Sequence, residues 1–324
     1  SLPEVADYND MMKIMDNILD EDPHTKAREM VVEVDHPRIG KMKTLGVPMK
    51  FSETPGEVKT AAPLLGQHTR EILEELDIDS CINETSDKLI SHLNYKSIET
   101  NKYLVCFTPE AFLQLISAFS SMFNARSIID GLSLMNEDSL GNQISVPNLN
   151  ISDEGLHPKN VGAFSFDGEG TPTQNIQLVS NGILTNLLHS EATARKFGVR
   201  PTGHAGLGAK VSVSPDWLVV SKSKSEMDKD ASLSIKETIK EYILIDELSA
   251  IHSGVKASQG SFSLPFDGWI VNDGKKTSIE AATVAGDILK VLSTIVKIEN
   301  EQIVTHQGIS PHVWVENMSI TGEA

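Results

Sequence analysis

Two Asx-Gly pairs, each placed between apolar runs, constrain the fold more than any other feature of the sequence. Asn181-Gly182 interrupts the stretch NIQLVSNGILTNLL, and Asp273-Gly274 interrupts GWIVNDGKKTSIE. Such pairs favour two-residue turns between antiparallel strands, because both turn residues need positive φ angles. The sequence therefore predicts two β-hairpins and a mainly β domain that contains them.

A strand followed by a helix is predicted before the two hairpins. Residues 103–107 form a strand-like run, and Thr108 and Pro109 then suit the cap and the first turn of a helix. Apolar residues recur after them at spacings of three and four, which predicts a helix of about four turns with one face in the core. These residues are Phe112, Leu115, Ile116, Phe119 and Met122.

Three further segments differ in how clearly their sequence specifies a structure. Residues 189–198 predict a short helix, with Ser190 as its N-cap and Gly198 as its stop. Residues 221–241 are charged and almost without large apolar side chains, which indicates a solvated excursion from the sheet. Residues 283–298 fit a helix or a buried pair of strands, and periodicity alone does not separate the two.

The first 79 residues differ from the rest of the chain. They hold 17 of its acidic and 9 of its basic residues. Residues 27–37 alternate as a strand does, and 68–78 predict a short helix. Residues 80–102 are polar and weakly periodic, as expected of a connector or of the remnant of a larger domain. The first segment offers too little apolar surface for a core of its own.

Composition excludes several classes of function. A formal charge of −17 without a basic stripe argues against nucleic-acid binding. No apolar run approaches the ~20 residues that span a bilayer, and the first residues lack the features of a secretory signal. The two cysteines, Cys81 and Cys106, are too few for a disulfide framework. We therefore expect a cytoplasmic protein that contacts neither nucleic acid nor membrane directly.

The stretch FDGEGTPTQ, which holds Asp167 and Glu169 between glycines, invites tests for phosphate and metal binding. It leads into a hairpin, whereas a dinucleotide fingerprint must open a helix. It lacks the spaced carboxylates of a calcium loop, and the chain has no His-Glu-x-x-His zinc motif. Gly268 to Lys276 has the wrong spacing for a phosphate loop and lacks its Ser or Thr. The residues alone indicate an acidic turn that feeds the Asn181-Gly182 hairpin.

Several motifs, in a fixed order, indicate a family. They are DSLGNQI, FDGEGTPTQ, SNGILTNLLHSEATARKFG, PTGHAGLGA, GSFSLPFDGWIVNDGK, ATVAGD and VWVENMSITGE. From about residue 103 to 323 the chain resembles the C-terminal domain of the TldD/PmbA (TldE) family, whose members include proteins called modulators of DNA gyrase. The resemblance implies an α+β fold, a mainly antiparallel β domain with a few helices, after a small, partly extended α/β segment. It also implies a pair of related subunits.

By this resemblance, the chain is of the PmbA type. The family's TldD-type subunit carries zinc on a helix with a His-Glu-x-x-x-His motif, and the PmbA type lacks it. Ile116, Ser117 and Ser121 stand where the first His, the Glu and the second His would be. The family's further Cys ligand lies near the C-terminus, where this chain has no Cys. The resemblance thus implies a non-catalytic subunit without a metal or other cofactor.

The resemblance also suggests a partner and a substrate site. The expected partner is a TldD-like zinc peptidase subunit, with a homodimer as the alternative assembly, and the expected substrate is an extended peptide. The most family-like loop stretches are hypothesised to lie near its cleft, and the competing interpretation is that they are turns that keep hairpin register. The residues are Asp167, Gly168, Glu169, Gly170, Thr171, Thr173, Thr202, Gly203 and His204.

Residues 1–78 resemble another family, in the stretch from EDPHTKAREMVVEVDHPRIG to HTREILEELDI. They look like the C-terminal tail of a class III (CaiB/BaiF-type) CoA-transferase, without the part that holds that family's catalytic Asp. We therefore predict a CoA-transferase-tail-like segment over 1–79, a linker or remnant over 80–102, and a PmbA/TldE-like domain over 103–324. Two alternative functions remain: a CoA-transferase-related fragment, and a free-standing metallopeptidase with unrecognised ligands. For the latter, the candidate ligands are His189, His204, His252 and His312.

Overall fold

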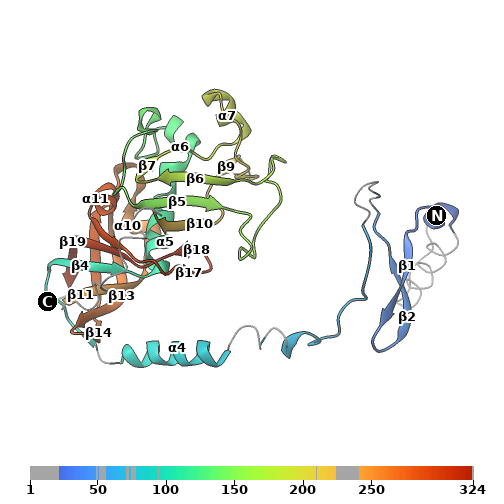
Figure 1. The fold of residues 1–324 in the computed structure, drawn as a ribbon, viewed down its shortest axis with the longest axis horizontal. Helices are drawn as coiled ribbons and strands as arrows, with labels where there is room; N and C mark the ends of the chain where they lie inside the picture. The colour runs from blue at the N-terminus through green and yellow to red at the C-terminus, as the bar shows by residue number, and fades with distance from the viewer. Residues whose placement is uncertain are drawn as a thin grey trace. The chain divides into compact units, whose positions relative to one another are not determined.

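The computed structural model of the chain describes residues 22–48, 50, 56–70, 73, 78–93, 95–208, 210–223 and 241–322. The chain divides into two compact units, Ser1–Thr85 and Ser86–Ala324. Figure 1 draws the first unit in blue tones and the second from cyan to red. This division falls within the segment that the sequence predicted to be a connector.

The first unit is built around one hairpin. Strand β1 (Val31–His36) pairs antiparallel with β2 (Gly40–Leu45), after the short helix α2 (Pro23–Ala27). Val34 is the one apolar side chain of the described part of this unit that is buried. The strand predicted at 27–37 is thus present as β1, but its first residues precede the strand, and Ala27 ends α2. The helix predicted at 68–78 falls largely outside the described residues.

The segment predicted as a connector is mostly regular secondary structure. Helix α4 (Ile78–Ser91) is followed by β3 (Tyr95–Lys96). Ser91 Oγ accepts a hydrogen bond from Trp269 Nε1 at 3.0 Å, and the ring of His92 lies 5.0 Å from that of Trp269. The polar sequence of α4 did not indicate a helix. Its last turn contacts Trp269, which is almost 180 positions away in the sequence.

The larger sheet of the second unit has nine strands. In chain order they are β3, β4 (Asn101–Phe107), β11 (Glu241–Leu248), β12 (Val255–Lys256), β13 (Ser261–Asn272), β14 (Lys275–Ile279), β15 (Ala282–Asp287), β16 (Ile295–Ile298) and β19 (Val313–Gly322). The pairings β11–β4–β19–β15–β13 return to β11 and so form a closed circuit of five strands. Closure leaves these five strands without an open edge along the circuit.

A second sheet of six strands lies beside the first in the unit (Figure 1). Its order is β17 (Ile303–Val304), β18 (Gly308–Ser310), β10 (Leu218–Lys222), β5 (Leu149–Glu154), β6 (Asn175–Ser180) and β7 (Ile183–Leu184). The short strands β8 (Ala205–Gly206) and β9 (Ser212–Val213) form a separate hairpin. The long connection from β5 to β6 and the β8–β9 hairpin carry most of the candidate site.

Both predicted hairpins are confirmed. Asn181 and Gly182 have φ angles of 49° and 80° between β6 and β7, and Asp273 and Gly274 have φ angles of 46° and 80° between β13 and β14. Positive φ at both central residues is the requirement of a type I′ turn, which Asx-Gly pairs meet at low cost.

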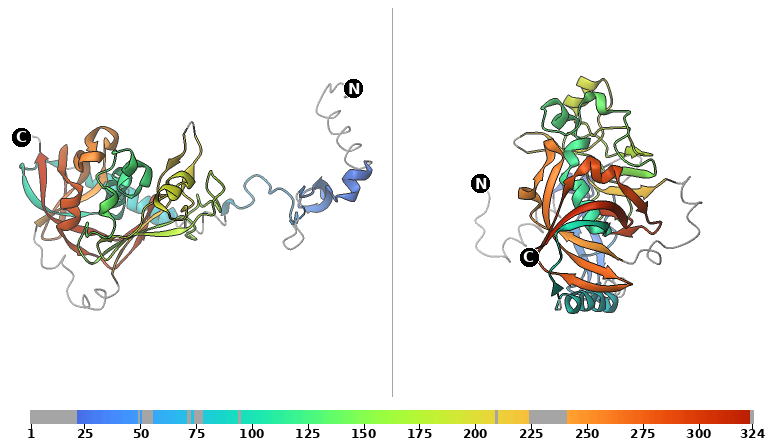
Figure 2. Two further views of the ribbon diagram at one scale, coloured as in Figure 1. Left: turned by 90° about the horizontal axis from the view of Figure 1, so that it is seen from above. Right: turned by 90° about the vertical axis from the view of Figure 1, so that its left-hand side faces the viewer.

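Helix α5 (Pro109–Ala118) occupies the core between the sheets (Figure 2). Thr108 caps it as predicted, by accepting a hydrogen bond from the Ala111 N–H, and the helix contacts β4 and β11 of one sheet and β18 of the other. The prediction of about four regular turns was wrong in its second half. The chain continues from α5 as the 3₁₀ helix η1 (Ser120–Phe123), because the tighter turn still buries Met122 and Phe123.

The other helices are short. Helix α7 (Glu191–Phe197) has the predicted cap, Ser190, and the predicted left-handed stop, Gly198. The ambiguous segment 283–298 contains both alternatives, since α11 (Ile288–Ser293) stands between β15 and β16. The remaining ones are α6 (Ala125–Ile129), η2 (Glu137–Ser139), α10 (Ile251–Gly254) and η3 (Ala257–Gln259). Most of the predicted excursion, 224–240, lies outside the described residues.

The fold is therefore mainly antiparallel β with a few helices, as the sequence predicts. Parallel pairing occurs between β4 and β11, β10 and β18, and β14 and β3. Across the described ranges, none of the helices combines the length and apolar character that crossing a bilayer requires.

Candidate functional site

Two loops that are more than 30 residues apart in the sequence are joined by hydrogen bonds. The Gly168 N–H donates to the Ala205 carbonyl at 2.6 Å, and the Ala205 N–H donates to Asp167 Oδ2 at 2.9 Å. The predicted site residues of 167–173 and 202–204 thus belong to one structural unit.

Asp167 organises the first loop. Its Oδ1 accepts hydrogen bonds from the N–H groups of Glu169 and Thr171, each at 2.9 Å. Glu169 in turn accepts, through Oε2, a hydrogen bond from the Glu191 N–H at 2.8 Å, at the start of α7. The N-terminus of a helix favours a carboxylate at this position. Both acidic residues of the FDGEG turn are therefore anchored to backbone donors, as the turn interpretation requires.

Two glycines allow the loops to approach one another. Gly203 has a φ of +77°, and a Cβ atom there would collide with the Pro172 carbonyl and lie 2.8 Å from Thr173 Cα. A Cβ on Gly168 would lie 2.8 Å from the Ala205 carbonyl oxygen. Any larger residue at either position would force the loops apart.

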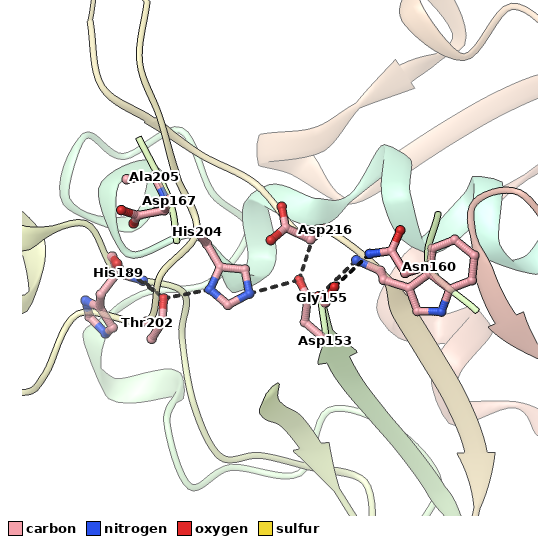
Figure 3. Close-up of polar contacts among 10 residues, drawn as sticks. Asp153, Gly155, Asn160, Asp167, His189, Thr202, His204, Ala205 and Asp216 are labelled. Atoms are coloured by element: carbon pink, nitrogen blue, oxygen red, sulfur yellow. Dashed lines mark hydrogen bonds and ion pairs between the residues drawn. The ribbon is translucent and has the colours of Figure 1, made fainter. Parts of the chain in front are cut away.

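A series of polar contacts connects His189, Thr202, His204 and Asp153, as Figure 3 shows. Thr202 Oγ1 accepts a hydrogen bond from the His189 N–H at 2.9 Å and donates to the His189 carbonyl at 3.2 Å. His204 Nδ1 is 3.0 Å from the same hydroxyl oxygen, and His204 Nε2 is 3.5 Å from Asp153 Oδ2. When His204 is protonated, its Nδ1 donates to Thr202 Oγ1, and the hydroxyl proton of Thr202 is donated to the His189 carbonyl.

Asp153, on strand β5, is the last residue of this series of contacts. Its side chain is fully buried, Oδ1 accepts a hydrogen bond from the Trp217 N–H at 2.9 Å, and Oδ2 accepts one from the Asp216 N–H at 2.8 Å. Burial lowers the pKa of His204, but hydrogen bonding to Asp153 and the charges of Asp153 and Asp216 outweigh it, so the pKa is raised overall. Protonated His204 and Asp153 then form a buried ion pair.

Asp216 and His189 respond differently to burial. Burial raises the pKa of Asp216, the His204 charge opposes this, and the charges of Asp153 and Asp167 raise it further. Burial alone lowers the pKa of His189, whose ring packs edge-on against Phe197 at 5.2 Å. His189 is therefore a neutral core residue, whereas Asp216 is a partly shielded carboxyl group at the surface.

The loops enclose a pocket of about 350 Å³, which we call the His204 pocket. Its lining includes five of the residues predicted from the sequence. It also includes three apolar side chains that are 76%, 65% and 70% exposed, in the order in which they are named below. The five are Asp167, Gly168, Thr173, Gly203 and His204, and the three are Phe164, Phe166 and Leu207. Ala205, Gly206, Ser214 and Asp216 complete it.

The other predicted residues are not part of the pocket wall. Glu169 reaches α7, Thr202 supports His204, and neither lines the pocket, nor do Gly170 and Thr171. Sequence reasoning missed Asp153 and Asp216. Asp153 could have been noticed, because it occupies a buried-face position of the alternating strand β5.

A larger hollow of about 660 Å³ lies along helix α5, and we call it the α5 groove. It is lined by Gln114, Ser117, Ala118, Ile251, His252, Val255, Ala257 and Gln307. Ser117 is exposed to it, whereas Ile116 is only 2% exposed. Ser121 lies on η1, and its Oγ is buried without a hydrogen-bond partner in the described part of the chain.

Comparison with known proteins identifies the second unit. Residues 100–322 match the family model of the PmbA/TldA metallopeptidase C-terminal domain. The chain belongs to the TldD/PmbA family. Metalloprotease PmbA of Escherichia coli is 27% identical over 241 residues, which are 73% of this chain and 49% of that protein.

Two solved structures agree with this membership of the TldD/PmbA family. A Thermotoga maritima protein described as a candidate modulator of a DNA gyrase is 32% identical, with a TM-score of 0.62 over 70% of this chain and 51% of its own. TldE from Thermococcus kodakarensis shares the fold, with a TM-score of 0.65 at 20% identity over 76% of this chain and 56% of its own. The chain spans about half the length of the curated TldD/PmbA relatives it matches.

Residues 11–69 match a different model, that of CoA-transferase family III. Two parts of the chain thus match the models of two different families. The match covers the α2 helix and the β1–β2 hairpin of the first unit.

The residues expected by resemblance at the positions of the TldD-type zinc motif lie on α5 and η1. Ile116 offers no ligand atom, and the side chains of Ser117 and Ser121 are hydroxyl groups where the resemblance would place a Glu and a His. Among the residues that the structure describes, no three His, Cys, Asp or Glu side chains are grouped to hold a metal ion. This includes His189, His204, His252 and His312, the ligands considered for a free-standing metallopeptidase.

Proposed function

We propose that the protein is a PmbA/TldE-like subunit that binds extended peptides and presents them to a TldD-like zinc peptidase. One observation carries this proposal: the α5 groove is open beside the helix that bears zinc ligands in the TldD type, but its own residues there are Ile116, Ser117 and Ser121. In this proposal the subunit keeps the substrate cleft and leaves the hydrolysis to its partner.

The lining of the α5 groove suits a peptide. Gln114, Ser117 and Gln307 supply polar atoms that can hydrogen-bond to a main chain, and Ile251 and Val255 supply apolar contact for side chains. A mixed lining of this kind in a hollow of several hundred Å³ is typical of ligand sites.

A sheet edge reaches the same groove. Strand β17 is the outermost strand of the six-stranded sheet, and Gln307, in the turn between β17 and β18, lines the groove. An extended peptide that adds to an open edge gains main-chain hydrogen bonds without sequence demands. This mode suits a subunit that holds unfolded substrates of varied sequence.

The proposal is tested by co-expressing the chain with a zinc-bearing TldD-type subunit, followed by size-exclusion chromatography and a peptidase assay. We expect the two chains to co-elute and cleavage to require the zinc-bearing subunit. Peptidase activity with stoichiometric zinc in this chain alone would overturn the non-catalytic role, and separate elution would overturn the pairing.

A pair of variants tests the groove itself. Ser117→Arg places a long side chain in the α5 groove, and Ser293→Arg places one at the exposed end of α11. We expect at least a tenfold loss of affinity for a fluorescent extended peptide in the first variant, or about 1.4 kcal/mol, and none in the second. Equal binding by both variants would place the peptide elsewhere.

A further inference from the structure

Asp216 is the one carboxylate of the His204 pocket wall that accepts no hydrogen bond from the described residues. The carboxylates of Asp153 and Asp167 receive backbone N–H groups, whereas Asp216 contributes only its own N–H, to Asp153. The Asp216 carboxylate therefore keeps its acceptor capacity for a ligand in the pocket.

The charges around this carboxylate are not balanced. Among the described residues that line the His204 pocket, none is Lys or Arg, and His204 is already engaged by Thr202 and Asp153. Two carboxylates line the wall and a third, that of Asp153, lies directly behind His204. A partly desolvated, anionic site of this kind attracts a cation more strongly than the same groups would in water.

His204 provides an independent sign that the site favours a positive charge. The residue is 3% exposed, and its Nε2 lies 3.5 Å from Asp153 Oδ2, so the contact is an ion pair at the limit of hydrogen-bond distance. Loss of the ring's positive charge would leave the buried carboxylate of Asp153 without its ion-pair partner. A positive charge is favourable here whether it is the proton of His204 or a ligand in the adjacent pocket.

The mouth of the pocket offers aromatic faces. Phe164 and Phe166 are 76% and 65% exposed and line the same pocket, so they form a small apolar patch beside the carboxylates. The loop that carries Phe164 is held by Asn160, whose Nδ2 donates to the Gly155 carbonyl at 2.8 Å (Figure 3). Aromatic rings beside carboxylates are a common receptor for organic cations.

We infer that the His204 pocket binds an organic ammonium or guanidinium group, with Asp216 as its counter-ion and Phe164 and Phe166 against its alkyl stem. This inference rests on the proposed peptide-binding function and names the substrate class: a peptide with a basic group, either a free N-terminus or a Lys or Arg side chain. At about 350 Å³, the pocket has room for one such side chain and its neighbouring main chain.

The binding is measured by isothermal titration calorimetry with the full chain. Four probes separate the sources of charge: an acetylated peptide with one central Lys, the same peptide with norleucine in its place, a norleucine peptide with a free N-terminus, and cadaverine alone. We expect the Lys or the free N-terminal peptide to bind at least tenfold more tightly than the acetylated norleucine peptide, and the better of the two identifies the source.

Variants test whether the preference for the basic peptide arises in the His204 pocket. Asp216→Asn should reduce the affinity for the basic peptide about tenfold and leave the norleucine peptide unchanged. Asp138→Asn, at an exposed position on η2, removes the same charge and should change neither. Phe166→Leu should weaken binding of the basic peptide about threefold while keeping the pocket apolar. Unaltered melting temperatures will show that the variants are folded.

The pH dependence gives a second readout. The titratable groups that face Asp216 are His204, Asp153 and Asp167. Ionisation of Asp216 and loss of the His204 proton both favour a bound cation, so affinity should rise with pH and rise less in Asp216→Asn.

Each outcome bears on one of the two proposals. Equal affinity for charged and neutral peptides would overturn the cation site and leave the peptide-binding function standing. Binding of cadaverine that Asp216→Asn abolishes, without binding of any peptide, would support the site and overturn the peptide function. Binding of none of the four probes would overturn both.

Discussion

Replacing Asp153 by Asn probes the buried ion pair at the centre of the site. The carboxylate accepts N–H groups from Asp216 and Trp217 and lies 3.5 Å from His204 Nε2, with both side chains fully buried. Asparagine retains one oxygen, so its NH₂ group faces a backbone N–H or His204. An unsatisfied buried donor costs about 1–3 kcal/mol, and breaking a buried ion pair costs about 3–5 kcal/mol.

The two contributions respond differently to pH. The folded pKa of His204 is raised above its unfolded value of about 6.5, so the ion-pair contribution is fully present below that value. It is lost as the pH rises through the folded pKa, whereas the hydrogen-bond contribution remains. We therefore expect Asp153→Asn to destabilise the fold by about 4 kcal/mol at low pH and by about 1–3 kcal/mol at high pH.

The assay is urea unfolding followed by circular dichroism, at pH about 5.5, below the unfolded pKa of His204, and at pH about 9, well above it. His204→Gln and the double variant complete a double-mutant cycle, which isolates the coupling between the two side chains. Asp138→Asn controls for the change in net charge. A cost for Asp153→Asn that is the same at both pH values, or a cycle without coupling at low pH, would refute the ion pair.

Two other predictions test the close approach of the loops and the CoA-transferase-like segment of the chain. Gly203→Ala should lower the unfolding free energy by at least about 2 kcal/mol, because its Cβ meets the Pro172 carbonyl, whereas Gly198→Ala, with a φ of +68° and no neighbour within 4 Å, should cost only about 1 kcal/mol. Thermal unfolding measures both, and equal costs would contradict the contact. Calorimetry with CoA should show no binding, since the matched segment, 11–69, lacks the catalytic part of a CoA-transferase; micromolar affinity would contradict this.

Local features of the fold were predictable from the sequence. The turns at Asn181-Gly182 and Asp273-Gly274 and the caps at Thr108, Ser190 and Gly198 depend on φ angles and hydrogen bonds within a few residues. Their residue types determine them almost without regard to the rest of the chain. In contrast, 283–298 remained ambiguous, because apolar runs of this length suit strands and helices alike.

Non-local features were not predictable in the same way. The parallel pairing of β4 with β11 joins strands that are more than 130 residues apart, and the last turn of helix α4 contacts Trp269. In the site, the loops at 167–173 and 202–204 were suggested by resemblance, and the structure brings them together. Asp153 and Asp216 belong to β5 and to the turn before β10, and only tertiary pairing brings them to His204.

The closed circuit of five strands also has a consequence for biosynthesis. Phe107 of β4 pairs with Val313 of β19, so the ring cannot close before some 200 further residues have left the ribosome. At about 5–20 residues per second, β4 waits roughly 10–40 s for this neighbour, and for most of that time also for β11. An apolar strand unpaired for so long is a natural binding site for a chaperone, and slow translation of the last strands should increase aggregation.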